Sequence, residues 1–257
     1  MYGPLREGDA LTAAVVGALV RVPLPIRTSA APAIDRANEA LAGFVDGNGR
    51  IRTPPHGLAY PTYMAADAVI VLSNADEDRF ASARNAWLEY LCQRQLAEPL
   101  GWSDADAAYG GWGYAADLPH KPAEGAPLGN LAEPNLSATV FAMRAMRAAG
   151  IAADAPAMRK ALAFVGRCQN FEPDDARRDK KFDDGGFHFM LNDPVRNKAG
   201  VAGVDAQNRT RFISYGSTTA DGLRGLLLGG QSADSERLQA ALRWMRRHFS
   251  ATDHPGA

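Results

Sequence analysis

The sequence predicts an all-α fold built from about four helical hairpins. Three observations support this fold class: helical hydrophobic patterns recur along the 257 residues, the recurring segments align at nearly constant offsets, and glycine or proline separates the helices of each pair. A hydrophobic fraction of 46% is ordinary for a soluble globular protein with a large core. We expect one domain over residues 1–257, with repeats at about 8–50, 58–114, 135–189 and 215–250.

The best-defined hairpin occupies residues 135–169. Its first half is apolar on nearly every side, as expected for a helix surrounded by protein. Its second half carries Met158, Leu162 and Val165 at helical spacing, which predicts an outer helix with one buried face. Gly150 separates the halves, because the left-handed residue that ends a helix is most easily glycine.

The same hairpin recurs at other positions of the chain. One constant shift along the sequence lays Tyr215 on Asn135, and a slightly shorter shift in the other direction lays Tyr60 on Asn135. A fainter first copy pairs residues 11–20 with residues 34–44. These alignments predict four hairpins and eight helices, with an inner and an outer helix in each repeat.

Two long connections, residues 96–134 and 170–213, follow the second and third outer helices. Connections of this length within a compact domain are usually functional or disordered. Each contains a glycine pair followed by aromatic residues, Gly-Gly-Trp-Gly-Tyr at 110–114 and Gly-Gly-Phe-His-Phe at 185–189. We expect these two insets to form tight turns whose rings fill space between helices.

The repeats and insets together resemble the α/α-toroid superfamily of squalene–hopene cyclases and protein prenyltransferase β subunits, the squalene-cyclase/prenyltransferase repeat proteins. The resemblance covers about residues 55–250. It rests on Gln95 before Gly110-Gly-Trp112, on Gln169-Asn170 before Asp184-Gly-Gly-Phe187, and on Tyr215-Gly-Ser-Thr-Thr219 opening a buried helix. It implies an α/α toroid whose inner helices line a cavity for an isoprenoid chain. Four hairpins imply an incomplete ring, whose open edge offers a surface for oligomer contacts.

The chemistry that the resemblance implies is only partly matched. Cyclases of this superfamily protonate their substrate with an Asp-x-Asp-Asp motif at the start of an inner helix, and the corresponding segments 135–139 and 215–219 contain no carboxylate. Prenyltransferases instead use zinc held by Asp, Cys and His. Cys168, Asp184 and His188 lack the family spacing, so we expect neither a metal nor another cofactor.

Three aspartates are the candidate catalytic acids. Asp67 and Asp221 lie within otherwise apolar inner helices, where an unpaired charge is costly. Asp184 precedes the glycine pair of the second inset, next to Asp183. A general acid at neutral pH needs burial or a partner that raises its pKa. The alternative for each residue is a structural ion pair or a turn contact.

Aromatic residues at inner-helix starts and in the insets are the candidate substrate-binding wall. Ring faces stabilise carbocations, although core packing explains the same residues equally well. The set consists of Tyr60, Tyr63, Trp112, Tyr114, Phe187, Phe189 and Tyr215.

Two functions from different classes fit these features. The first is an isoprenoid-handling enzyme with a cyclase-like (isomerase or lyase) activity, and the second is a non-catalytic scaffold that binds a protein or glycan through its long loops. With 28 basic and 29 acidic residues, the net charge of −1 argues against a nucleic-acid surface. Residues 10–20 are too few to span a bilayer, so a first core helix is favoured over a signal peptide. Membrane association stays possible but is not indicated. The compartment stays open, with the cytoplasm slightly favoured over export.

Overall fold

The computed structural model describes residues 9–53, 58–126 and 132–256. Eight α-helices dominate these residues, which confirms the predicted, mostly helical fold. The helices are α1 (Asp9–Leu19), α2 (Leu24–Ala42), α3 (Pro61–Leu72), α4 (Glu77–Cys92), α5 (Leu136–Ala148), α6 (Pro156–Arg167), α7 (Gly216–Leu228) and α8 (Glu236–His248). A 3-10 turn (Glu98–Leu100) and two strands, β1 (Val201–Val204) and β2 (Thr210–Phe212), lie in the long connections. None of the described helices is both long and apolar enough to cross a bilayer.

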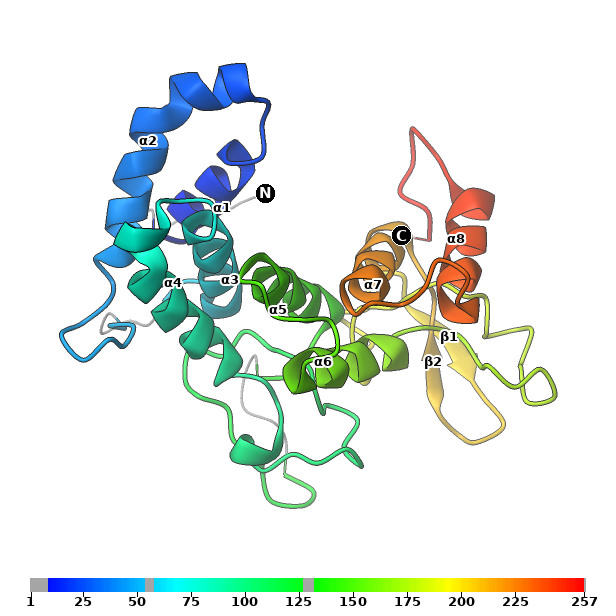
Figure 1. The fold of residues 1–257 in the computed structure, drawn as a ribbon. Helices are drawn as coiled ribbons and strands as arrows, with labels where there is room; N and C mark the ends of the chain where they lie inside the picture. The colour runs from blue at the N-terminus through cyan, green and yellow to red at the C-terminus, as the bar shows by residue number, and fades with distance from the viewer. Residues whose placement is uncertain (1–8, 54–57, 127–131, 257) are drawn as a thin grey trace.

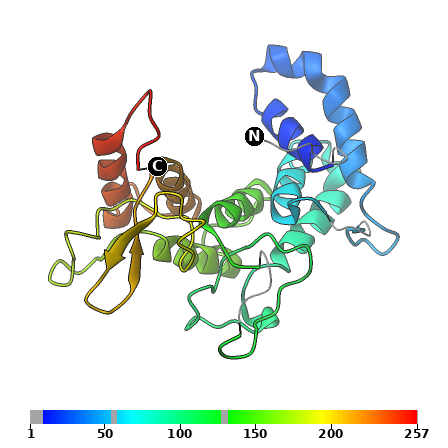
Figure 2. The same cartoon turned by 180° about the vertical axis from the view of Figure 1, so that it is seen from behind.

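The helices are arranged as four hairpins along an arc (Figures 1 and 2). The odd-numbered helices pack in a row, with α3 between α1 and α5, and α5 between α3 and α7. Each even-numbered helix packs against the helix that precedes it, and lies outside this row. The row of α1, α3, α5 and α7 therefore forms the concave side of the arc, whose two ends stand apart in both views.

Burial follows the predicted division into inner and outer helices. Eleven of the twelve residues of α3 are buried, whereas α6 buries one face through Met158, Ala161, Phe164 and Val165. Alanine is frequent where inner helices meet, because a small side chain allows two helix backbones to approach closely. The inner row thus forms the core, and the outer helices cover its convex side.

A glutamine fixes the first inset between two outer helices. The side-chain Nε2 of Gln95 donates to Gly110 O at 3.0 Å and to Ala157 O at 2.9 Å, which joins the inset to the start of α6. Trp112 N then donates to Oγ1 of Thr139 in the next inner helix, at 3.1 Å. We call this arrangement the glutamine frame, because one side chain holds the inset against both neighbouring hairpins.

The second inset repeats the glutamine frame atom for atom. Gln169 Nε2 donates to Gly185 O at 3.0 Å and to Arg237 O at 2.9 Å, which joins this inset to α8. Phe187 N donates to Thr219 Oγ1 at 3.1 Å. The alignment of the insets predicted from sequence therefore reflects one set of hydrogen bonds used twice.

Glycine is required at two positions where an inset meets a neighbouring helix. Gly110 has a φ of 89°, and a Cβ atom there would lie 2.0 Å from Lys160 O. In α7, a Cβ atom on Gly222 would lie 2.4 Å from the Phe187 ring. Both positions therefore exclude any larger residue unless the backbone or the ring moves.

Two local features differ from the expectations. Helix α2 begins at Leu24 rather than near Ile34, because Pro25 lies in the first turn, where its missing N–H is not needed. Pro32 lies inside this helix, which is visibly bent in Figure 1. The connection 170–213 contains the antiparallel hairpin β1–β2, which adds a small sheet to the helical fold.

Candidate functional site

The concave side of the arc contains a groove between α5 and α7, with a volume of about 410 Å³. Its lining combines three arginines and one aspartate with four apolar side chains. These residues are Val140, Phe141, Arg144, Arg147, Asp221, Arg224, Leu227 and Leu228. The groove is therefore amphipathic, and its ionisable lining groups carry a formal charge of 3 − 1 = +2.

Two residues at equivalent steps of the repeat face this groove. Phe141 and Asp221 each lie six residues after the N-cap of their helix, Asn135 in α5 and Tyr215 in α7. The Asn135 side chain accepts from Ala138 N at 2.9 Å, which fixes where α5 starts. The helical period then brings the sixth residue to the inner face in both repeats.

Asp221 is partly removed from solvent and is paired with an arginine. Its side chain is 22% exposed, and Arg224 Nη1 donates to its Oδ1 at 3.2 Å. Burial raises the pKa of Asp221, and the charge of Arg224 and the Ser137 hydroxyl oppose that rise. Asp221 consequently meets the first requirement of a general acid, which is a pKa above that of an exposed carboxyl.

Aromatic rings lie next to Asp221 on the same face. The Tyr63 and Tyr114 hydroxyls are 3.3 Å apart and their rings stack at 5.5 Å, while the Tyr63 ring meets Phe141 edge-on at 4.8 Å. Burial raises the pKa of Tyr63, hydrogen bonds with Ser137 and Tyr114 lower it, and the charge of Asp221 raises it further. We call Tyr63, Tyr114, Ser137, Phe141 and Asp221 the aromatic–acid cluster.

The arginines of the groove extend from the aromatic–acid cluster, where Arg224 pairs with Asp221, to the opposite end, where Arg147 lies. Arg147 follows Ser137 by ten residues, which corresponds to about 15 Å along an α-helix. Its Nη1 donates to Ile151 O at 2.7 Å, beyond the last turn of α5. The Arg144 guanidinium lies between these ends, 5.6 Å from the Phe141 ring. The groove thus has an aromatic–acid end and a basic end.

Asp67, the second predicted acid, lies where α3 packs against α1. It is 7% exposed, and a Cβ atom on Gly17 of α1 would lie 3.4 Å from its Oδ1. Burial raises the pKa of Asp67 to about 6, and the charge of Arg21 opposes that rise. Its described contacts are with α1, so the structure does not bring it into the aromatic–acid cluster.

Asp184, the third predicted acid, is held by the protein itself. Its Oδ1 accepts from Gly186 N at 3.0 Å and from Ser214 Oγ at 2.7 Å. Its Oδ2 accepts from Trp244 Nε1 at 3.0 Å. Three donors on one carboxylate hold it in a fixed orientation. These contacts support the structural alternative, in which Asp184 anchors the second inset against α8.

The residues of the predicted aromatic wall do not line one common surface. Tyr63 and Tyr114 join the aromatic–acid cluster. Trp112 and Phe187 are fully buried in the two glutamine frames, where they fill the core rather than line the groove. Tyr215 is 4% exposed, and burial, followed by the charge of Asp221, raises its pKa to about 12.

Phe189 and Tyr60 remain outside the cluster. Phe189 O accepts from Leu136 N at 2.9 Å, so its backbone holds the first residue of α5. Tyr60 is 60% exposed and has a φ of 50°, an uncommon conformation for a bulky residue. No contact among the described residues joins Tyr60 to the groove.

Sequence reasoning missed the basic end of the groove. Arg144 and Arg147 lie in the helix described from the sequence as apolar on nearly every side, and no arginine was among the predicted site residues. The signal was present, since the shift that lays Tyr215 on Asn135 also lays Arg224 on Arg144, at an inner-face position of both repeats. A charge that recurs at one step of a buried helix indicates a wet cavity or a ligand.

Within the described ranges, no cluster of three or more His, Cys, Asp or Glu side chains is placed to hold a metal ion. Neither a scan against models of protein families nor a search of curated proteins finds a match to this chain.

Proposed function

We propose that the chain is an α/α-toroid protein that binds an isoprenoid with an anionic head group in the groove between α5 and α7. We further propose that Asp221 donates a proton to the hydrocarbon part of that ligand. The observation that carries the proposal is the combination, in one groove, of a basic end, apolar walls and a partly desolvated carboxyl beside aromatic rings. The resemblance to squalene-cyclase/prenyltransferase repeats supports the isoprenoid class.

The toroid part of the proposal is supported by the inner row of helices and by the repeated glutamine frame. Each frame ties an inset to the following outer helix, so that successive hairpins turn by a similar step. A row of hairpins built in this way curves around its inner helices, as the arc in Figure 1 does. The groove lies on that inner side, where a toroid cavity would hold its ligand.

The basic end suits a phosphate or diphosphate head group. Guanidinium groups bind phosphate oxygens through paired, charge-assisted hydrogen bonds. The Arg224 side chain is 69% exposed, so it is free to turn from Asp221 toward an incoming anion. Losing that cation would raise the pKa of Asp221 further. Head-group binding would therefore prepare the acid for proton transfer.

The apolar walls suit a hydrocarbon tail. Leu227 is 57% exposed and lies beside Leu228 and Val140 in the lining of the groove. Covering apolar surface contributes roughly 25 cal/mol per Å². A tail that extends from the arginines toward Tyr63 and Phe141 would pass Asp221 on the way.

The proposed step is the protonation of an alkene by Asp221. The carboxyl O–H bond breaks, the π electrons of the alkene form a new C–H bond, and positive charge develops on the adjacent carbon. The ring faces of Tyr63, Tyr114 and Phe141 stabilise that carbocation. Loss of a proton from the cation to the Asp221 carboxylate forms a new alkene and restores the acid, so the reaction is an isomerisation.

The test compares geranylgeranyl diphosphate with squalene, which has no anionic head. Calorimetry should show tighter binding of the diphosphate, weakened about tenfold by Arg144→Gln or Arg147→Gln, because each removes a charge-assisted contact. Arg243→Gln, on the exposed side of α8, is the matched control. Asp221→Asn should keep the affinity within about threefold and abolish product formation, measured by gas chromatography and mass spectrometry. Equal affinity for both ligands, or undiminished turnover in Asp221→Asn, would refute the proposal.

A further inference from the structure

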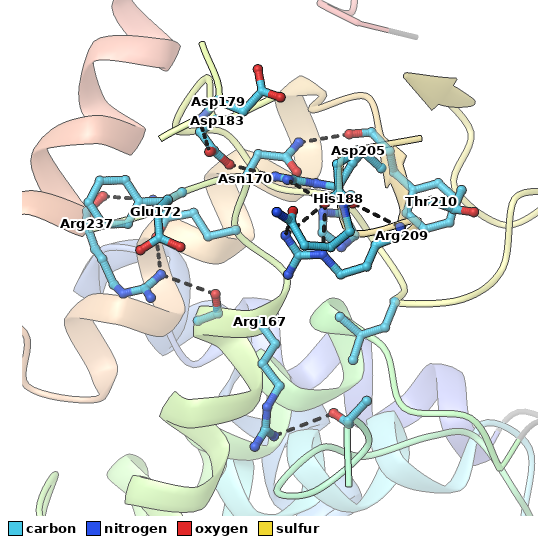
Figure 3. A pocket seen from close by; sticks show the side chains of 18 of the residues that line it. Arg167, Asn170, Glu172, Asp179, Asp183, His188, Asp205, Arg209, Thr210 and Arg237 are labelled. Atoms are coloured by element: carbon cyan, nitrogen blue, oxygen red, sulfur yellow. Dashed lines mark hydrogen bonds and ion pairs between the residues drawn. The ribbon is translucent and has the colours of Figure 1, made fainter. Parts of the chain in front are cut away.

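A larger cleft lies on another part of the surface, between α6, residues 169–172 and the β1–β2 hairpin (Figure 3). Its volume is about 1650 Å³, and none of its lining residues lines the groove between α5 and α7. Drug-sized ligands occupy pockets of about 300 to 1,000 Å³, so this cleft is large enough for an extended, chain-like ligand. The two sites can therefore be tested independently.

Two buried polar side chains lie in the middle of this cleft, with hydrogen-bonding capacity to spare. His188 and Asn170 are 7% and 2% exposed, and Figure 3 shows them near one another. Within the described residues, His188 Nδ1 and Asn170 Oδ1 have no hydrogen-bond partner. Buried polar atoms nearly always have partners. These two atoms have almost no accessible surface, so a ligand supplies their partners when the side chains turn toward the cleft. These atoms distinguish the cleft from an ordinary surface hollow.

The unsatisfied atoms call for both donors and acceptors. Asn170 Oδ1 needs a donor. Burial, reinforced by the charge of Arg211, lowers the pKa of His188 to about 4. The imidazole is therefore neutral at physiological pH, with one nitrogen that donates and one that accepts. Hydroxyl groups donate and accept at once, so a polyhydroxylated ligand meets both requirements.

The charged side chains next to His188 are held in place by ion pairs with one another. Arg211 bonds Asp183 Oδ1 at 2.6 Å and lies 3.4 Å from Asp205 Oδ2, while Arg209 lies 2.8 Å from the same oxygen. The side chains of Asp183 and Asp205 are 5% and 2% exposed. Such a network holds planar polar groups in fixed orientations, as recognition of ring hydroxyls requires.

The cleft is also more basic than the rest of the chain. Six arginines and four carboxylates line it, a formal charge of 6 − 4 = +2, whereas the whole chain carries −1. Arg177 lines the cleft, and its guanidinium makes no described ion pair. Unpaired positive charge on a surface of this kind attracts anionic ligands.

We propose that this cleft binds an acidic oligosaccharide, a chain of hydroxylated rings that carry carboxylates. The ring hydroxyls bond the polar floor around His188 and Asn170, and the carboxylates meet the arginines of the rim. This assignment gives a chemical class to the protein- or glycan-binding role considered for the long connection 170–213. It does not depend on the isoprenoid proposal.

The test is calorimetric titration of the full chain with tetragalacturonate, using cellotetraose as the neutral match and tetraglutamate as the acidic peptide. We expect tetragalacturonate to bind at least tenfold more tightly than either, and more weakly at higher salt. Arg177→Gln should weaken this binding about tenfold with an unchanged melting temperature, because its side chain has no described partner to lose. Arg243→Gln, outside the cleft, should bind like the native chain.

The location of the binding is checked by hydrogen exchange. Tetragalacturonate should protect residues 169–172 and 201–212 and leave α5 unprotected. Tighter binding of tetraglutamate would show that the cleft binds an acidic peptide rather than a glycan. Equal binding of cellotetraose would show that the cleft does not recognise the carboxylates of the ligand. Failure of all three ligands to bind would overturn the proposal, whatever the outcome for the isoprenoid groove.

Discussion

The hairpins α5–α6 and α7–α8 have the same frame and different concave faces. In both, a threonine four residues after the N-cap accepts a hydrogen bond from the aromatic residue of the preceding inset, Thr139 from Trp112 and Thr219 from Phe187. Two residues further on, the first hairpin presents a phenylalanine to the groove and the second presents Asp221. The residues that the two repeats share hold the fold together, and the residues at which they differ set the polarity of the groove.

The largest effects should come from the glycines that the two frames have in common. In Gly110→Ala the new methyl group would lie 2.0 Å from Lys160 O, and in Gly185→Ala it would lie 2.7 Å from Ala240 O. Both residues also have a φ near 90°. We expect each variant to lose more than about 4 kcal/mol of unfolding free energy, with the larger loss at Gly110.

Urea denaturation measures the loss of unfolding free energy in Gly110→Ala and Gly185→Ala. Gly47→Ala is the matched control, because nothing lies within 4 Å of the added Cβ, and it should change stability by less than about 0.5 kcal/mol. If the denaturation midpoint of Gly110→Ala equals that of the native chain, the inset does not pack against α6 as described.

The glutamines of the two frames should give the next largest effect. Gln95→Leu removes two hydrogen bonds and Gln169→Leu removes three, because Gln169 Oε1 also accepts from Arg237 Nη1 at 3.2 Å. Both variants leave carbonyl oxygens without a donor, which should cost about 2 to 4 kcal/mol. Gln93→Leu is the control, since Gln93 bonds only the exposed Glu89 side chain. If the two frames are equivalent, thermal denaturation should give similar losses for both variants, and a loss confined to one would break the comparison.

The buried carboxyl of Asp67 should make stability depend on pH. Its folded-state pKa of about 6 lies above the ordinary value of 3.8, so the folded protein binds more protons between about pH 4 and pH 6. The contribution of this group to stability therefore falls as the pH rises through that window. Asp67→Asn should be about 2 to 3 kcal/mol more stable than the native chain at pH 7 and show no gain at pH 4. A gain of equal size at both values would disprove a raised pKa.

The smallest effect should come from the threonine hydroxyls. Thr139→Val and Thr219→Val keep the shape of the side chain and remove one acceptor from a buried N–H, which should cost about 1 to 2 kcal/mol each. Ser217→Val, at the exposed start of α7, is not expected to match this loss, because its hydroxyl has no place in the frame. Chemical denaturation of the three variants tests whether both repeats depend on this contact equally.

Much of the fold could be predicted because it is repeated. The shift that lays Tyr215 on Asn135 aligns N-caps and helix ends, and the insets align in the same way, so one hairpin predicts the next. The start of α2 at Leu24 could not be predicted in this way, because the first repeat is the faintest copy. The strands β1 and β2 have only four and three residues, too few for an alternating pattern to stand out.

The candidate site was predicted less completely than the fold. The burial cost of a charge in an apolar helix singled out Asp221 and Asp67 equally, and only the structure separates them, since Asp67 faces α1. Tyr63 and Asp221 share a site although they lie far apart in the sequence. Periodicity does not report which inner faces meet. It also did not distinguish rings that line a groove from Trp112 and Phe187, which are packed inside the frames.

The concave groove is tested most directly by crosslinking with a prenyl diphosphate that carries a photoreactive diazirine on its tail. Irradiation of the native chain, followed by peptide mass spectrometry, should place the label on residues of α5 and α7 that face the groove, such as Phe141 and Leu227. Excess unlabelled diphosphate should prevent the reaction. Labelling confined to the outer helices, or unaffected by the competitor, would contradict a ligand site on the concave side.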